Sequence, residues 1–504
     1  MDIFMLESKP FIYPFCTAGG CYFYDVNKNR IIGVSKETYK YLDGKTNELN
    51  PDVEQEINTL IKKGYLSDKK LKYILHPASK SLEYILDSAL EKITLQVTQQ
   101  CNLRCEYCIY SGDTGNYRNR SHQNKSMSFD MARKGIDFLI EHSQDSNRLN
   151  IGFYGGEPLL EFELIKKCVK YAKEQAEGKE ISFSITTNAT LLSEDIIKYL
   201  SENDIMLTIS LDGPKEIHNK NRKFAGSGVG SFDKIMENLE ILKERYPEYF
   251  NNILFNVVID PTVDFKCISE FFVNYDTVKD TIQMATLPST NYSNKNVTMS
   301  DNFRADYNYE FFKIFLSKLG RLEKKYISNF NLSYFERLKN TYYEKKALTT
   351  GLLDYGHPGG PCIPGQMRLF MNVDGVFYPC ERVSETSEVM KIGTVEKGFD
   401  IEKCLKILNI GKITEQSCIN CWAFRYCSQC AALADDTKEL TSEKRLKQCV
   451  SAKRDVEEQM KEYCTLLELG YDFEGEDYPF IQISKNQWEA KENDTETKIA
   501  GISL

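Results

Sequence analysis

Hydrophobic positions switch repeatedly between a strand-like and a helix-like spacing from about residue 90 to residue 290. Between short apolar runs lie amphipathic stretches such as Met131–Ile140 and Phe232–Leu242. Strands that alternate with helices form a parallel sheet with right-handed crossovers, and functional side chains gather at the carboxyl ends of such strands. The pattern therefore predicts an α/β fold, and six units suit an incomplete barrel. The strand candidates are Ile93–Val97, Ile151–Tyr154, Ile181–Thr186, Met206–Leu211, Ile253–Ile259 and Thr281–Ala285.

Residues 1–78 have a different pattern and predict a small separate domain. Two aromatic runs, starting at Phe11 and Cys21, read as short strands, and the polar turn at Asn27 predicts a hairpin into a third. Two helices are expected after it, Lys36–Leu42 and a stretch from Pro51 to Lys63 that Gly64 ends.

The remaining chain divides by composition. Residues 291–355 are charged and predict a helical connecting segment, and residues 356–465 are rich in cysteine. Residues 466–504 are expected to form a polar and partly mobile tail.

Composition and charge narrow the function. The net charge is −9, from 64 basic and 73 acidic residues, and no basic block indicates a nucleic-acid partner. No signal peptide and no apolar run of membrane-spanning length occur, which predicts a cytoplasmic protein without a membrane partner. Sixteen cysteines in such a chain favour metal or cluster ligation over a disulfide scaffold, and only five histidines disfavour a histidine-based zinc site.

Three cysteines lie close together just after the first strand candidate, at Cys101, Cys105 and Cys108. Three thiolates on one loop can hold three irons of a [4Fe–4S] cluster and leave the fourth iron open, because closed clusters and zinc sites use four ligands. Three free thiols are the alternative. The run, with Tyr107 before its last cysteine, resembles the signature of the radical S-adenosylmethionine (SAM) enzymes.

That resemblance implies a partial (β/α)6 barrel, SAM bound to the open iron, and a 5′-deoxyadenosyl radical formed by reductive cleavage of SAM. It also implies an external electron donor of the flavodoxin or ferredoxin type. Further family motifs follow the next strands and give the residues expected to contact SAM. These are Gly155, Gly156 and Glu157 for the amino group, Thr187 and Asn188 in a Thr-Asn-Gly motif with Ala189 for Gly, Ser210 and Asp212 near the ribose, and Arg222 for the carboxylate.

The C-terminal cysteines resemble those of the SPASM domain, which carries two auxiliary iron–sulfur clusters. By family precedent, Cys418, Cys421, Cys427 and Cys449 hold one cluster, and Cys362, Cys380 and Cys430 hold the other. A zinc ribbon is the alternative for the segment Cys418–Cys430. The three-cysteine set lacks a fourth ligand, which Cys404, His357, water or a substrate thiolate could supply. Six further cysteines lack ligand spacing and are expected to be buried or free thiols: Cys16, Cys21, Cys168, Cys267, Cys404 and Cys464.

Residues 1–78 resemble the small winged-helix domain that binds leader peptides. Together these features predict a radical SAM/SPASM maturase that forms thioether cross-links in a cysteine-rich precursor peptide. The first alternative is an anaerobic sulfatase-maturing enzyme, in which Glu381, directly after Cys380, takes the place of the catalytic base. The second alternative is a non-catalytic iron–sulfur scaffold or electron-transfer protein.

Overall fold

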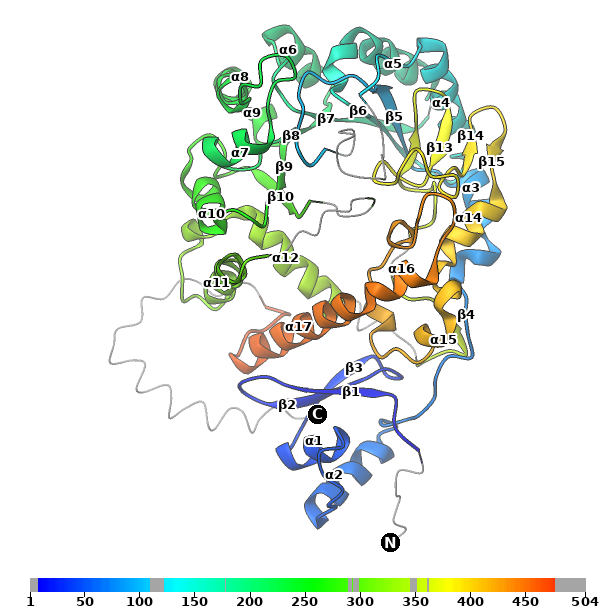
Figure 1. Cartoon of the computed structure of the whole chain (residues 1–504), viewed down its shortest axis with the longest axis vertical. Helices are drawn as coiled ribbons and strands as arrows, with labels where there is room; N and C mark the ends of the chain where they lie inside the picture. Colours follow the sequence, from blue (N-terminus) through cyan, green and yellow to red (C-terminus); the bar gives the residue numbers. More distant parts are fainter. Residues whose placement is uncertain are drawn as a thin grey trace.

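A computed structural model describes residues 8–108, 122–176, 178–288, 292, 299–344, 351–359 and 362–475. Its centre is a curved sheet of six parallel strands, one for each strand candidate (Figure 1). In sheet order they are β5 (Lys92–Thr98), β6 (Arg148–Gly155), β7 (Glu180–Thr187), β8 (Met206–Ser210), β9 (Leu254–Val258) and β10 (Ile282–Thr286). The predicted incomplete α/β barrel is thereby confirmed.

Helices cover the outer face of this sheet because alternate strand residues point toward them and are apolar. Several begin at a side chain that caps their first turn, such as Ser128, Ser193 and Asp264. The helices after the successive strands are α4 (Phe129–Glu141), α5 (Phe162–Gln175), α6 (Glu194–Glu202), α7 (Lys215–Asn221), α8 (Phe232–Arg245), α9 (Pro247–Phe250) and α10 (Phe265–Asn274).

The cysteine-rich segment continues the barrel sheet. Strand β12 (Leu369–Met371) pairs in parallel with β5, and β13 (Val376–Tyr378), β14 (Gly393–Thr394) and β15 (Gly398–Phe399) follow it as antiparallel neighbours. The segment is joined to the first strand of the barrel by main-chain hydrogen bonds, which its cysteine spacing did not reveal. Its helices are α14 (Ile401–Leu408), α15 (Glu415–Cys418), α16 (Ser442–Lys447) and α17 (Cys449–Glu468).

The N-terminal part forms an antiparallel sheet of β1 (Ile12–Cys16), β2 (Cys21–Asp25) and β3 (Arg30–Val34), followed by α1 (Lys36–Leu42) and α2 (Pro51–Lys62). The predicted hairpin joins β2 to β3, and Gly64 with φ +80° lies just past the end of α2. A linker with α3 (Leu82–Ser88) leads to the barrel, and its β4 (Tyr73–Ile74) pairs with β11 (Tyr355–Gly356).

Cys16 and Cys21 form a disulfide, so the expectation that both are buried or free thiols is wrong. The register of β1 and β2 places these two residues opposite each other at the end of the hairpin. Their separation of five residues does not reveal this register, because it depends on the intervening turn. Of the other four, Cys168, Cys404 and Cys464 are buried, and Cys267 is exposed.

The N-terminal sheet packs on helix α17, which lies across it in Figure 1. Tyr13 stacks on Trp422 with ring centroids 3.6 Å apart and donates a 2.6 Å hydrogen bond to Glu457 of α17. Phe11, Phe15, Tyr24 and Val26 share one hydrophobic core with α17 and with the helices of the connecting segment. Apolar packing therefore holds the N-terminal sheet against α17 and the connecting segment.

The connecting segment contains α11 (Asp301–Lys318) and α12 (Asn329–Lys339). Beyond α17, Tyr471 and Phe473 are buried in the same core, so the beginning of the expected tail is packed. Residues 476–504, the rest of that tail, lie outside the described residues. Among the helices of the described ranges, none combines the length and the apolar character needed to cross a membrane.

The contact between α12 and α17 includes a partly buried glutamate with a perturbed pKa. Tyr334 donates a hydrogen bond to Glu462, and burial raises the pKa of Glu462 to about 7. A carboxyl group whose folded pKa exceeds its unfolded pKa stabilises the fold when protonated. This contribution is complete below about pH 4.5 and is lost as the pH rises through about 7.

Glu462→Gln should therefore stabilise the protein at pH 8, on the order of 1–3 kcal/mol, because glutamine keeps the acceptor oxygen and carries no charge. The gain should shrink as the pH falls toward 5. Anaerobic urea unfolding at several pH values measures it. The matched control is Glu83→Gln at an exposed position of α3. An equal gain at pH 5 and pH 8 would contradict this assignment.

Candidate active site

Cys101, Cys105 and Cys108 lie on one loop, residues 101–108, which we call the cluster loop. Backbone hydrogen bonds hold this loop against a second segment, residues 221–225, which we call the strap. The amide of Arg104 donates to the carbonyl of Lys223 (2.8 Å), and that of Glu106 donates to Asn221 (3.1 Å). In the other direction, the amide of Ala225 donates to the carbonyl of Asn102 (2.8 Å). The strap begins at the last residue of α7, so the position of Cys101, Cys105 and Cys108 depends on how α7 is fixed.

Gly155, the last residue of β6, and Gly156 after it touch the backbone that leads into this loop. A Cβ atom on Gly155 would overlap the carbonyl oxygen of Thr98, and one on Gly156 would overlap that of Gln100. Gly155 also has φ +148°, which disfavours other residues. The sequence analysis assigned these glycines to the SAM amino group, and in the structure they also allow the close approach of the backbone before the cluster loop.

Glu157 links the end of β6 to the end of β7. Its buried carboxylate accepts hydrogen bonds from the Thr187 hydroxyl (2.6 Å), the Asn188 amide (2.8 Å) and the Leu159 amide (3.0 Å). Burial nevertheless raises the pKa of Glu157, with these three donors opposing the shift. The three predicted SAM contacts Glu157, Thr187 and Asn188 are thus in one cluster of side chains.

The Thr-Asn-Gly position filled by alanine has the backbone conformation that favours glycine. Ala189 has φ 60°, and its carbonyl accepts a hydrogen bond from the Asn238 side chain (2.8 Å). Asn188 reaches back toward the cluster loop, where its amide lies 2.9 Å from the Asn102 side-chain oxygen and 3.9 Å from the Cys101 sulfur. The turn therefore has the left-handed backbone that glycine favours, and alanine is strained there.

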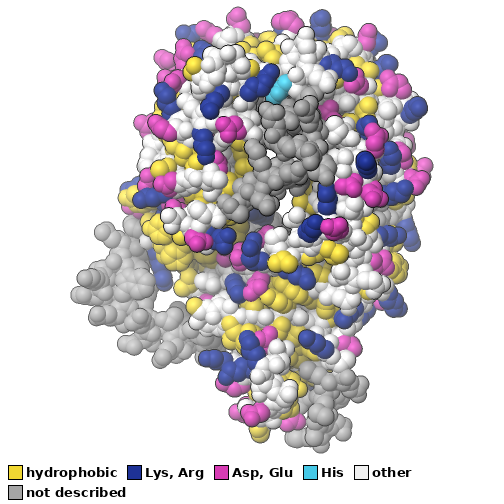
Figure 2. Space-filling view, in the orientation of Figure 1, with side chains coloured by type: hydrophobic (Ala, Val, Ile, Leu, Met, Phe, Trp, Pro, Cys, Tyr) yellow, Lys and Arg dark blue, Asp and Glu magenta, His cyan; other side chains and the backbone are white. Residues whose placement is uncertain are grey.

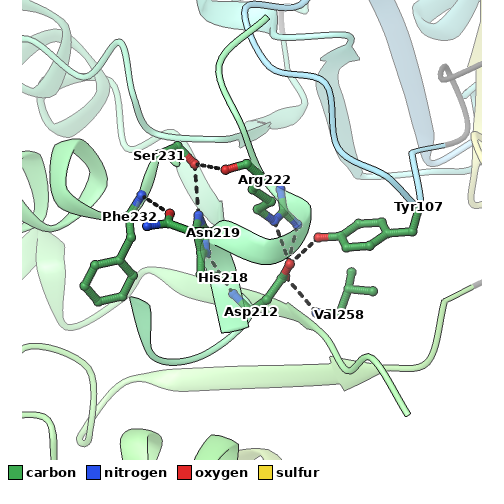
Figure 3. A network of polar contacts seen from close by, with 8 residues as sticks. All are labelled: Tyr107, Asp212, His218, Asn219, Arg222, Ser231, Phe232 and Val258. Carbon is green, nitrogen blue, oxygen red and sulfur yellow. Dashed lines mark hydrogen bonds and ion pairs between the residues drawn. The ribbon is translucent and has the colours of Figure 1, made fainter. Parts of the chain in front are cut away.

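Asp212 and Arg222 form a buried ion pair beside the cluster loop (Figure 3). The Arg222 guanidinium donates to both carboxylate oxygens, at 2.9 and 3.1 Å, and the Tyr107 hydroxyl donates to the same carboxylate. The amide of Val258 adds a fourth hydrogen bond, at 3.1 Å. The sequence predicted Arg222 for the SAM carboxylate, but its fork here faces Asp212. Ser210 is buried at the end of β8, two residues before Asp212.

His218 closes a ring of hydrogen bonds with this pair (Figure 3). The Asp212 amide donates to Nδ1 of His218 (3.3 Å), whose Nε2 is 3.0 Å from the Ser231 hydroxyl, and Ser231 donates to the Arg222 carbonyl (3.2 Å). Burial lowers the pKa of His218 to about 4, so its imidazole is neutral at pH 7. The ring spans α7 and fixes the start of the strap. No motif in the sequence marks Ser231.

The three thiols of the loop lie close enough to influence one another. Burial raises the pKa of both Cys101 and Cys105 to about 12, and each thiol is affected by the charge of Cys108. The Arg222 guanidinium opposes the shift at Cys105. Across the described ranges, no three His, Cys, Asp or Glu side chains converge on a point where one metal ion could sit. The loop fits a cluster, whose thiolates are spread over several irons; its ligand set stays a prediction.

The C-terminal cysteines lie in two neighbourhoods. Electrostatic interactions join Cys418, Cys421, Cys427 and Cys449, while Cys380 interacts with Cys430. These groupings match the sets predicted from the sequence, apart from Cys362, for which only its exposure is known. Whether both sets carry iron–sulfur clusters stays a prediction.

Glu381, the candidate base of the sulfatase-type alternative, is in an ion pair. Arg368 donates a hydrogen bond to its carboxylate, and Arg382 lies 3.7 Å away. Arg368 also opposes the effect of burial on Cys380, whose pKa is raised to about 11. The partner of Glu381 could not be found from the sequence, since no motif marks Arg368.

The surface carries charges of both signs, interspersed over the face seen in Figure 2.

The chain is similar to several known proteins in sequence and in fold. Residues 95–272 match the model of the Radical SAM superfamily. A radical SAM cyclopropyl synthase, TigE, of Paramaledivibacter caminithermalis is 24% identical over 418 residues, 80% of each chain. A cysteine-type anaerobic sulfatase-maturating enzyme of Clostridium perfringens is 26% identical over 357 residues, 67% of this chain and 88% of that one. An uncharacterized protein of Methanocaldococcus jannaschii is 37% identical over 154 residues, and this chain spans about half (49%) of its length.

A solved structure described as native anSMEcpe with bound AdoMet has the same fold. Its TM-score is 0.56 at 21% identity, with 75% of this chain and 98% of that chain covered. Residues 95–272 therefore have the sequence pattern and the fold of a radical SAM domain. Radical SAM enzymes use a [4Fe–4S] cluster and SAM, and the relatives include enzymes named for cyclopropyl synthesis and for sulfatase maturation.

Gly155→Ala should displace the cluster loop, because the new methyl group overlaps the Thr98 carbonyl and the backbone is strained. Anaerobically reconstituted protein should then lose much of the iron of the first cluster, by about four irons per chain at most. Iron analysis with the cluster's absorbance measures this. The control Gly226→Ala adds a methyl group with no atom within 4 Å. Equal iron content in both variants would count against this role of Gly155.

Asp212→Asn leaves the buried Arg222 without its counter-charge, since the two side chains are 1% and 7% exposed. It should destabilise the fold by about 3–5 kcal/mol in denaturant unfolding. Glu180→Gln breaks a surface pair with Arg148 of similar separation, 2.9 Å, and should cost about 0–1 kcal/mol. Comparable losses in the two variants would show that the buried pair has no special role.

Proposed function

We propose that this enzyme modifies a cysteine-containing peptide and forms a thioether bond between a cysteine sulfur and a carbon atom. The proposal rests on the predicted set Cys362, Cys380 and Cys430, in which Cys380 and Cys430 interact electrostatically and for which we find no fourth ligand among the described residues. An iron with a free position there would bind a substrate thiolate and favour loss of its proton.

The two internal candidates for the fourth ligand are engaged elsewhere. His357 uses both ring nitrogens, because Nδ1 lies 2.8 Å from the Pro358 carbonyl and Nε2 accepts the Gly411 amide at 3.0 Å. Cys404 is fully buried in the main hydrophobic core on α14. These contacts support a position that remains open for a substrate.

The same region disfavours the sulfatase-type alternative. The Arg368 guanidinium donates a hydrogen bond to Glu381, so this carboxylate would have to exchange that partner for the substrate to act as the general base. Similarity to the cysteine-type sulfatase-maturating enzyme supports a cysteine as the reacting residue. That similarity covers 67% of this chain, while the match to the cyclopropyl synthase covers 80%.

The N-terminal sheet fits the binding of an extended peptide. Within the described ranges β3 pairs with a strand on one side, β2, whereas β1 lies next to α17. The outer edge of β3 presents main-chain groups that a leader peptide could pair with as an added strand. We assign leader recognition to this edge.

The proposed reaction balances as follows. When bound, the first cluster and SAM accept one electron from an external donor and supply a 5′-deoxyadenosyl radical. Each cross-link replaces one C–H and one S–H bond by one C–S bond. The hydrogen atom leaves in 5′-deoxyadenosine, the thiol proton leaves to solvent, and one electron passes to an oxidised centre. Cys101, Cys105 and Cys108 hold the first cluster in this proposal, and the loop contacts described above orient it.

Addition of a cysteine-rich precursor peptide should change the electron paramagnetic resonance spectrum of one auxiliary cluster. The change should vanish when the donor cysteine of the peptide is replaced by serine. Cys430→Ala should abolish cross-linking, measured by mass spectrometry, and retain SAM cleavage. His357→Ala serves as the control for an internal ligand and should leave the resting spectrum as it is. A spectrum that ignores the peptide but changes in His357→Ala would refute the proposal.

A further inference from the structure

Arg445 on α16 is a buried cation that has no acidic partner among the described residues. Its side chain has the largest volume among the fully buried residues, and the residue is 2% exposed. Among the ion pairs of the described ranges, none involves Arg445. A guanidinium removed from water is costly unless an anionic group compensates it. The compensating group is therefore expected among its neighbours.

Those neighbours lead to the four-cysteine set by two short routes. Nε of Arg445 donates to the Thr414 hydroxyl (3.2 Å), which lies 3.2 Å from the Cys418 sulfur. Nη1 of Arg445 donates to the backbone carbonyl of Gln429 (3.4 Å), and the side-chain Nε2 of Gln429 donates to the Cys449 sulfur (3.6 Å).

Thr414 and Gln429 thus connect one arginine with two of the four predicted ligands. As thiols these groups are neutral and give the cation no counter-charge. As thiolates around a cluster they form a net anionic group.

We propose that Arg445 is the internal counter-charge of the cluster held by Cys418, Cys421, Cys427 and Cys449, and that it raises the reduction potential of this cluster. The inference rests on the proposed function, which assigns a cluster to these residues. Reduction adds one negative charge, and a cation in a low-dielectric surrounding stabilises the reduced state more than the oxidised state.

This tuning has a purpose in the proposed reaction. Formation of each C–S bond releases one electron from the substrate, which is oxidised, and an oxidised cluster that takes it is reduced. A higher potential makes that transfer more favourable. Arg445 is accordingly a positioning and tuning residue that acts through the cluster and need not touch the peptide.

The test compares Arg445→Gln, Arg445→Lys and Lys453→Gln in anaerobically reconstituted full-length enzyme. Potentiometric titration followed by electron paramagnetic resonance measures the potential of each cluster. Arg445→Gln should shift one auxiliary cluster to a more negative potential, while Arg445→Lys should keep most of the wild-type value. Lys453 acts on Cys421 from an exposed position, so its removal should have little effect because water screens its charge.

Thr414→Val provides a second variant if Arg445→Gln does not fold. It removes the hydroxyl between Arg445 and Cys418, and should shift the same cluster in the same direction by a smaller amount. Unchanged potentials in both variants, with iron content as in wild type, would overturn the role of Arg445 and leave the proposed function standing. Zinc or no metal at the four cysteines of the wild-type enzyme would overturn the cluster assignment and this inference together.

Discussion

The close contact between the backbone at Gly155–Gly156 and the start of the cluster loop constrains the rest of the active site. These two segments leave no room for a side chain between them. The ends of β5 and β6 are therefore fixed in position relative to each other. The Glu157 carboxylate then fixes the end of β7 relative to β6, and the strap secures the opposite side of the loop. The cysteine loop is therefore held by main-chain contacts on two sides. Such an arrangement resists displacement, because no single flexible side chain carries it.

An arginine lies near each of the three cysteine sets. The three arginines differ in whether a carboxylate neutralises their charge. Arg222 faces Cys105 and is paired with Asp212, and Arg368 faces Cys380 and is paired with Glu381. Arg445 lacks such a carboxylate among the described residues. A guanidinium whose charge is cancelled by a neighbour exerts a weaker field on a third group. The three sets consequently experience different electrostatic surroundings even though their ligands are chemically the same.

The sequence predicted the elements that depend on local patterns and missed those that depend on long-range pairing. All six barrel strands were found, because buried strands and amphipathic helices have different periods. The Cys16–Cys21 disulfide and the pairing of β12 with β5 were not found, since register and sheet order are set by tertiary contacts. At the site, the motif residues were found from their spacing, but the partners of Arg222, Glu381 and Cys418 were not. Asp212 was assigned to a ligand, whereas its carboxylate here accepts four hydrogen bonds from three residues, which no short motif encodes.

The shared core of the N-terminal sheet and helix α17 has a consequence for how this architecture can be rearranged. Phe11, Phe15 and Tyr24 are buried against residues that come from the far end of the chain. The N-terminal sheet therefore cannot be exchanged as an independent unit. A chimaera with another protein's N-terminal sheet would have to bring the matching surface of α17 with it, or else leave apolar side chains exposed to water. Under the proposed function, a change of peptide specificity by exchange of this sheet would therefore also require the helix that begins at Cys449.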